Sequence, residues 1–310
     1  MKTVKEVYAA WLSQGIELPI FYQPWWLDAA CGADHWSVVL AYEGELIVGI
    51  WPYYVRRRLM GWLPTLDKPP LTLFCGPYLL PPGQVMNKAN QLSRNQRIIR
   101  QLHVQLPDYR FRRASLPYAS QAGWPLQLLG WRIRQCYSYR IRSDAYAPDV
   151  LWRQLSGKLR SKLRQAQEQN GRIEPFDNAD AFQALFQQSL AKRPEKVAFP
   201  HRAFKRLFEQ SLQKKKARCW AFFNDENQVI AAVWLPFDQQ SAYLLGAASL
   251  PYLRNTTKAM PYLIWHAIQW CTQEKLIFDF EGSSLPGVEP FYRSFGPEIA
   301  GYQLVSNSRI

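Results

Sequence analysis

Apolar and polar positions recur along the chain in two distinct periods. In residues 1–143, alternation and short apolar runs predict strands, while a repeat of 3–4 residues predicts helices. The predicted strands cover residues 36–42, 46–55, 111–116 and 131–142, and the predicted helices cover residues 3–14 and 87–106. Residues 64–84 are rich in proline, which removes N–H donors from a strand ladder, so we predict loop or short strand there.

The pattern changes after a polar, turn-like segment near residue 143. We predict helices over residues 149–155, 157–170, 179–191, 201–214 and 257–273. Single strands are predicted over 173–176, 276–280 and 302–306, and a three-strand meander over 218–223, 229–237 and 241–247. This order predicts an α/β (α+β) mixed sheet flanked by helices, divided into domains 1–143 and 144–310.

One predicted helix, over residues 157–170, has a strongly cationic surface. Leu155, Leu159, Leu163 and Ala166 form its apolar stripe. The cations around the stripe are Lys158, Arg160, Lys162 and Arg164. Such a face can hold the phosphates of tRNA or of a lipid-linked pyrophosphate, and the alternative is a solvated helix surface.

The bulk composition supports an anionic partner. The 310 residues carry a formal net charge of +14, with a second cationic cluster from His201 to Arg218 that includes Lys214–Lys216. This charge predicts nucleic acid, a phosphate-bearing cofactor or an anionic lipid surface as partner; general solubility is the alternative. No apolar run is long enough for a membrane span, and the start lacks an apolar signal region. Five scattered cysteines predict reduced thiols, a cytoplasmic protein and no zinc site.

A strand near residue 280 places two acids in apolar surroundings. Asp279 and Glu281 stand at alternate positions, so we expect them to share a face. One of them could accept a proton from an attacking amine, or Glu281 could instead cap the following loop or pair with Arg293. Arg293 could contact a phosphate or a developing oxyanion.

Three segments together carry a family resemblance. The strand-loop-helix-strand order of residues 229–280 resembles the GNAT acyltransferase core. Trp152-x-x-Leu-x-x-Lys-x-Arg-x-x-x-Arg-x-Ala166 resembles the basic helix of the Fem-type (FemABX) peptidoglycan-bridge aminoacyltransferases, and residues 279–296 are similar to a closing stretch of that group. The resemblance covers residues 150–300 and is weak over 1–143. It implies two tandem GNAT-like domains, the first a divergent copy.

The resemblance also suggests where a donor would bind. GNAT enzymes hold pyrophosphate with an Arg/Gln-x-x-Gly-x-Gly/Ala loop, and the equivalent here contains Arg254, Thr257 and Lys258. Thr257 replaces the loop glycine that lets a backbone approach phosphate, which favours aminoacyl-tRNA, the Fem-type donor, over acyl-CoA. Gly246 would mark the strand splay that admits the acyl group.

These observations lead to one functional hypothesis with three alternatives. The hypothesis is transfer of an acyl or aminoacyl group to a substrate amine, without metal or redox cofactor. The acceptor could be lipid-linked, and the protein could contact an anionic membrane surface. The first alternative is an acyl-CoA enzyme that modifies a sugar amine or lipid headgroup in the cell envelope. The others are a non-catalytic nucleic-acid-binding module on a degenerate GNAT frame and a peripheral membrane protein.

Overall fold

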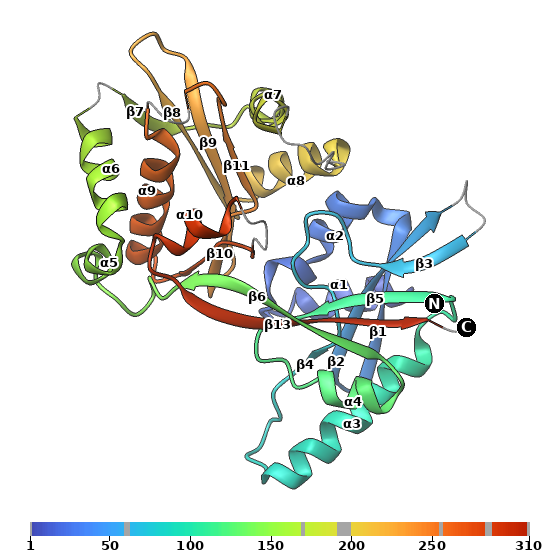
Figure 1. Ribbon diagram of the computed structural model, residues 1–310. Helices are drawn as coiled ribbons and strands as arrows, with labels where there is room; N and C mark the ends of the chain where they lie inside the picture. The colour runs from blue at the N-terminus through green and yellow to red at the C-terminus, as the bar shows by residue number, and fades with distance from the viewer. Residues whose placement is uncertain are drawn as a thin grey trace. The chain divides into compact units, whose positions relative to one another are not determined.

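The computed structural model describes residues 2–58, 63–168, 171–190, 200–253, 257–282 and 287–308 (Figure 1). The chain divides into two compact units, the first made of residues 1–136 together with 301–310, and the second of residues 137–300. Strands β6 (Arg132–Ile141) and β13 (Glu298–Ser308) each contain residues of both units. The division into domains 1–143 and 144–310 stays a prediction, and no sequence pattern indicated that residues 301–308 return to the first unit.

The first unit is built on a sheet whose strands follow the order β1-β2-β3-β5-β13. β1 and β2 form an antiparallel hairpin, β3 extends it, β5 runs parallel to β3, and β13 pairs antiparallel with β5. The strands are β1 (Trp36–Glu43), β2 (Leu46–Arg58), β3 (Leu63–Asp67), β4 (Tyr78–Leu79), which pairs with β2, and β5 (Phe111–Leu116).

Helices cover this sheet. They are α1 (Val4–Leu12), η1 (Ile20–Tyr22), α2 (Pro24–Cys31), η2 (Ala33–His35), α3 (Lys88–Gln105) and α4 (Gly123–Leu128). Figure 1 shows α3 and α4 together beneath the strands, and α3 contacts β1 and β2. The core there joins Trp51 of β2 to Ile98, Ile99 and Leu102 of α3, all fully or almost fully buried, because these apolar positions recur at helical spacing on α3.

The second unit contains two groups of strands. The larger is an antiparallel sheet in the order β11-β9-β8-β7, and in the smaller group β12 pairs antiparallel with β6 and parallel with β10. The strands are β7 (Arg172–Pro175), β8 (Ala217–Phe223), β9 (Val229–Pro236), β10 (Ser241–Tyr243), β11 (Gly246–Ser249) and β12 (Ile277–Asp279).

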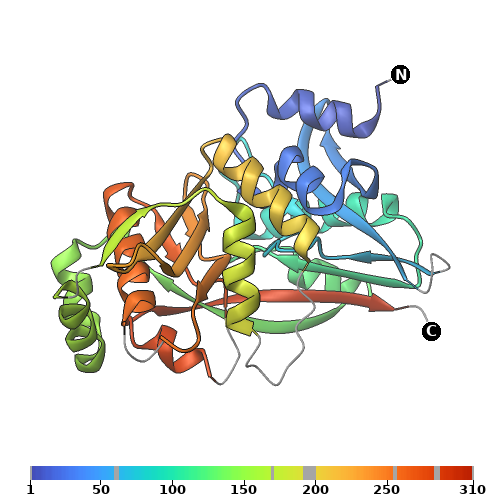
Figure 2. The same ribbon diagram turned by 90° about the horizontal axis from the view of Figure 1, so that it is seen from above.

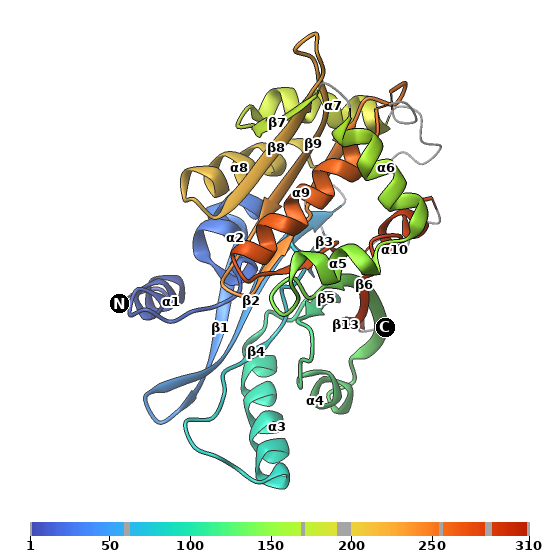
Figure 3. The same ribbon diagram turned by 90° about the vertical axis from the view of Figure 1, so that its left-hand side faces the viewer.

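Helices lie on both faces of the larger sheet. They are α5 (Pro148–Gln154), α6 (Gly157–Gln167), α7 (Ala179–Leu190), α8 (His201–Gln213), α9 (Ala259–Gln273) and α10 (Glu289–Arg293). Figure 2 shows α7 and α8 on the face opposite α9, and Figure 3 shows α6 beside α9. On the α7–α8 face, Trp234 packs against both Phe204 and Phe208, while on the α9 face Trp220 packs against Trp270. These rings fix the sheet between its two helical layers.

The predicted α/β (α+β) mixed sheet flanked by helices is confirmed, with three local differences. The third strand of the predicted meander is broken at Leu244–Leu245, where the Leu245 N–H donates to the Tyr243 carbonyl at 2.8 Å. The sequence analysis placed no helix at residues 289–293, where α10 lies, and it also missed α2 and α4. Pro24 at the start of α2 was a usable signal, because proline suits a first helical turn.

Candidate functional site

Two neighbouring strands of the second unit diverge at the break in the predicted meander. β10 runs parallel to β12 as far as the pair Tyr243–Asp279, and the Leu244 N–H then donates to the Asp279 carbonyl at 2.8 Å. Beyond this point the chain continues as β11, which pairs only with β9 and forms an edge of its sheet within the described residues. The outer edge of β11 therefore has no strand partner among the described residues, and such an edge is the kind that an extended ligand can pair with.

Gly246 stands at the start of β11, directly after the break. A Cβ at this position would lie 2.9 Å from Cζ and 3.2 Å from Cε1 of the Phe182 ring on α7. A side chain at this position would therefore require the Phe182 ring or β11 to shift. The predicted role of Gly246 in admitting an acyl group stays a prediction, but the structure places it where the strands separate.

Helix α9 follows β11 after a loop and contacts it. Lys258, its N-cap residue, has a left-handed backbone with φ of 49°. The N–H groups of Ala259 and Met260 belong to the first turn, where a helix offers donors without internal acceptors, whereas Pro261 has no N–H. This helix end combines two backbone donors with the charge of Lys258.

Thr257 and Arg254 are the other two residues of the predicted donor-binding loop. The N–H and the hydroxyl of Thr257 both donate to the Leu253 carbonyl, each at 3.0 Å. Both donors are therefore used within the loop, so this geometry favours a structural role for Thr257 rather than a contact with phosphate. Arg254 lies outside the described residues.

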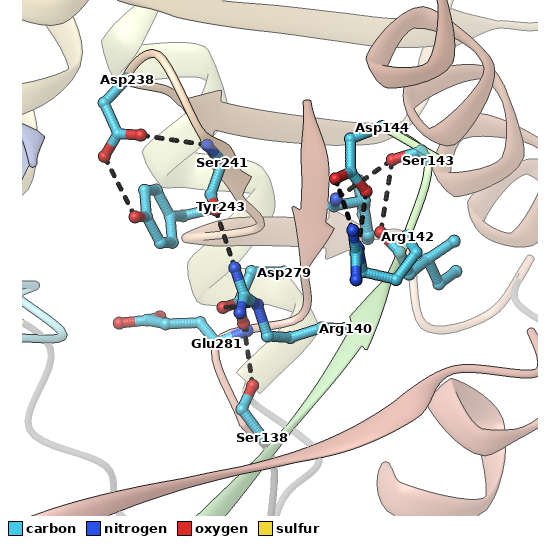
Figure 4. Close-up of polar contacts among 12 residues, drawn as sticks. Ser138, Arg140, Arg142, Ser143, Asp144, Asp238, Ser241, Tyr243, Asp279 and Glu281 are labelled. Carbon is cyan, nitrogen blue, oxygen red and sulfur yellow. Dashed lines mark hydrogen bonds and ion pairs between the residues drawn. The ribbon is translucent and has the colours of Figure 1, made fainter. Parts of the chain in front are cut away.

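Asp279 is fully buried at the end of β12 and ties three strands together. Its Oδ1 accepts hydrogen bonds from the Ser138 hydroxyl and the Glu281 N–H, both at 2.8 Å, and its Oδ2 lies 3.3 Å from Nε of Arg140 (Figure 4). Arg140 also donates to the Ser241 hydroxyl at 2.9 Å. Because a buried charge needs both a counter-charge and hydrogen bonds, this network holds β6, β10 and β12 in register at the divergence.

A second buried carboxylate shapes the turn before β10. Asp238 Oδ1 accepts the N–H groups of Gln240 and Ser241 at 2.9 and 3.0 Å, and Oδ2 accepts the Tyr243 hydroxyl at 3.0 Å (Figure 4). Burial and the negative charges of Asp238 and Asp279 raise the pKa of Tyr243 well above its ordinary value. The Tyr243 hydroxyl therefore stays protonated and fixed as a donor.

The expectation that Asp279 and Glu281 share a face is wrong. β12 ends at Asp279, so the alternation does not reach Glu281, which has a left-handed backbone with φ of 57°. Gly282 follows with φ of 62°, and a Cβ there would lie 2.9 Å from the Tyr137 carbonyl. Glu281 is partly exposed, and Figure 4 shows its side chain extending away from the Arg140 guanidinium.

Arg293 pairs with an acid other than the one proposed from the sequence. Its Nε donates to Oε1 of Glu289 at 2.9 Å, one turn earlier on α10, and the Tyr139 hydroxyl donates to the same oxygen at 2.5 Å. The hydrogen bond to Glu289 raises the pKa of Tyr139. The Arg293 side chain remains 66% exposed, so it can still reach a ligand in solution.

The cationic helix predicted from the sequence is α6. Leu159, Leu163 and Ala166 are buried, as the apolar stripe predicted. Lys158, Lys162 and Arg164 are exposed, and none has a carboxylate partner among the described residues. Arg160 is half-buried and donates to the Arg153 carbonyl at 3.2 Å. Binding of phosphate by this face stays a prediction.

Metal ligation and membrane crossing find no support in the described ranges. No group of three or more His, Cys, Asp or Glu side chains is arranged there to hold a metal ion. Every described helix is too short or too polar to span a lipid bilayer.

A comparison with protein families identifies the kind of domain that contains the diverging strands. Residues 153–293 match the family described as the acetyltransferase (GNAT) domain. This segment is a GNAT domain. The match confirms the resemblance to the GNAT acyltransferase core that was drawn from residues 229–280. A search of curated protein sequences gave no match.

Solved structures extend the likeness over both units. FemX shares 11% identity at a TM-score of 0.64, covering 98% of this chain and 96% of that one. A tandem GNAT protein from the clavulanic acid biosynthesis pathway shares 9% identity at a TM-score of 0.51, covering 94% of this chain and 97% of that one. The C-terminal domain of a putative lysylphosphatidylglycerol synthetase from Agrobacterium fabrum shares 12% identity at a TM-score of 0.52, covering 89% of this chain and 85% of that one. At these identities the likeness establishes the fold.

Proposed function

We propose that this protein transfers an acyl or aminoacyl group from an activated, phosphate-bearing donor to a substrate amine in cell-envelope synthesis. The observation that carries the proposal is the open edge of β11 beside the N-terminus of α9 in a GNAT domain. The edge can bind the extended part of a donor through backbone hydrogen bonds, while the helix end attracts its phosphate. The likeness to FemX and to a lysylphosphatidylglycerol synthetase domain supports the envelope setting.

The donor we favour is aminoacyl-tRNA. The end of α9 offers few backbone donors, because Pro261 lacks an N–H and both donors of Thr257 are used by Leu253. A large polyanion depends less on this one site, since the exposed cations of α6 can contact further phosphates. Acyl-CoA has fewer phosphates to place and would depend on the site at α9.

The chemistry joins the amine nitrogen to the donor carbonyl. Attack forms a tetrahedral intermediate, whose oxyanion would be stabilised by backbone N–H groups near Gly246. Glu281 would accept the proton from the amine, and collapse would break the bond to the leaving oxygen of tRNA, or the sulfur of CoA, which takes a proton. Asp279 would act as a positioning residue, because its Oδ1 accepts the Glu281 N–H and its charge is paired with Arg140.

One experiment identifies the donor, and a variant then tests the proton acceptor. Purified protein is incubated with aminoacyl-tRNA and, separately, with a panel of acyl-CoA donors and amine acceptors, and products are identified by mass spectrometry. On the substrate found, Glu281→Gln should lower kcat by at least about 100-fold. Glu226→Gln, the same change at an exposed turn residue, should leave kcat unchanged.

Two results would count against parts of this proposal. Full turnover by Glu281→Gln would remove Glu281 as the proton acceptor. Tight binding of tRNA without transfer to any amine would indicate a nucleic-acid-binding module that has lost its chemistry.

A further inference from the structure

A cavity of about 490 Å³ lies beside the C-terminal half of α9, at the face of β7 and β8. Its size is within the range of small-molecule sites. The side chains that matter for recognition come from β8 and α9: Arg218, Trp220, His266, Gln269, Trp270 and Gln273. None of the lining residues carries a carboxylate.

The cavity is set apart from the proposed transfer site along the same helix. His266 comes eight residues after Lys258, the N-cap residue of α9. At a rise of 1.5 Å per residue, this places the nearest lining residue of the helix about 12 Å along the axis from the N-terminus. A ligand in the cavity therefore does not occupy the end of the helix that would hold a donor's phosphate.

Aromatic rings and a guanidinium form one wall. The Trp220 ring meets the His266 ring at 5.1 Å and 88°, and the Trp270 ring at 5.5 Å and 63°. The Arg218 guanidinium lies 5.5 Å from the centre of the Trp270 ring. Rings that are held at fixed angles beside a planar cation offer stacking surfaces for another flat ring.

The polar groups at this cavity have unused hydrogen-bonding capacity. Gln269 and Gln273 are exposed, one turn apart on α9, and their amides make no hydrogen bond within the described part of the chain. Arg218 has no carboxylate partner among those residues. Burial lowers the pKa of His266, so its imidazole is neutral near pH 7 and presents one donor and one acceptor.

Three cations precede the lining residue Arg218 in the sequence. Lys214, Lys215 and Lys216 are exposed and precede β8, so that Lys216 stands two residues before Arg218. Cations this close to Arg218 disfavour a cationic ligand, although aromatic rings alone would accept one. A purely apolar ligand would leave the amides of Gln269 and Gln273 without partners.

We propose that this cavity binds an unpaired nucleotide, with its base stacked against Trp270 and Arg218 and its phosphate held by Lys214–Lys216. Paired amides suit the donor and acceptor edges of a base, and stacking on aromatic rings with cations along the backbone is the usual recognition of single-stranded nucleic acid. The proposal concerns a site separate from acyl transfer and does not depend on that activity. A free nucleotide and an unpaired nucleotide of an RNA strand share this chemistry.

Binding assays on the intact protein test the proposal without any acyl transfer. Anisotropy of a labelled single-stranded hexaribonucleotide and calorimetry with AMP measure the two sources, and inorganic phosphate serves as the probe without a base. The double variant Gln269→Glu with Gln273→Glu should raise the Kd of the nucleotide about 5- to 150-fold. The matched control is Gln187→Glu with Gln188→Glu, two exposed glutamines on α7, and should change it by no more than about twofold.

A second variant, whose fold is checked, keeps the test valid if the double variant misfolds. Trp270→Ala, checked by circular dichroism, should also raise the Kd about 5- to 150-fold through lost stacking. Binding of the hexamer well above that of AMP assigns the site to an RNA strand, and equal binding assigns it to free nucleotides; both support the proposal. Absence of nucleotide binding, equal binding of phosphate and AMP, or an equal effect of the variants and the control would overturn it.

Discussion

Replacing Asp279 by asparagine should destabilise the second unit far more than the same change at an exposed ion pair. Asp279 is fully buried and Arg140 is 19% exposed at the side chain, so Asp279→Asn leaves a largely buried guanidinium without its counter-charge. Breaking a buried pair costs about 3–5 kcal/mol. Asparagine keeps an Oδ1 that can accept from Ser138 and the Glu281 N–H, so we expect the lower end, about 3 kcal/mol.

The chain supplies its own control. Asp149 and Arg153 form an ion pair on α5 at 3.0 Å, with side chains 71% and 72% exposed. Asp149→Asn should cost at most about 0.5 kcal/mol, because water and salt screen the charges. Urea unfolding followed by tryptophan fluorescence gives both values, and a double-mutant cycle with Arg140→Met isolates the coupling of the buried pair. Equal losses for Asp279→Asn and Asp149→Asn would refute the argument that burial makes the Asp279 pair important.

Three further changes follow from the structure. Gly246→Ala forces a methyl group against Phe182 and should cost about 1–3 kcal/mol in urea unfolding, part of which Phe182→Leu should restore. Because burial lowers the pKa of His266, the unfolded state binds its proton more readily, so stability should be full above about pH 6.5 and decrease as the pH falls below it. Charge reversal at Lys158 and Arg164 should weaken binding of tRNA and lower the salt slope by about one per residue.

Each of these predictions has a result that contradicts it. A Gly246→Ala protein as stable as the parent would show that β11 can shift from α7 without cost. His266→Gln should flatten the pH dependence of the urea midpoint between pH 7.5 and 5.5, and an unchanged profile would assign that dependence to other groups. Lys88, an exposed cation on α3, provides the control for charge reversal; equal weakening by Lys88→Glu would mean that the response reflects net charge alone.

The apolar pattern predicted most elements because local periodicity carries that information. The stripe of Leu159, Leu163 and Ala166 is buried as its spacing required. The strand break at Leu244–Leu245 could not be predicted, since it depends on where β12 stops pairing with β10. A hydrophobic run shows that a strand is buried, but it does not show where a parallel neighbour leaves it.

The candidate site was predicted in part. The sequence singled out Asp279 as an acid in apolar surroundings, but its partner Ser138 lies 141 residues away, and neither Ser138 nor Arg140 stands in a recognisable motif. The alternation rule failed at Glu281 because β12 ends at Asp279 and the backbone is left-handed at Glu281 and Gly282. Spacing along a strand gives the direction of a side chain only while the strand continues.

The position of β13 has a consequence during protein synthesis. Six residues of β13 pair with β5, and the Arg112 side chain donates to Asn307, 195 residues further along the chain. At 5–20 residues per second, the ribosome needs about 10–40 s to reach that strand after β5 has emerged. During this interval β5 lacks one hydrogen-bonded neighbour, so the nascent first unit would display an unsatisfied strand edge to chaperones until translation is nearly complete.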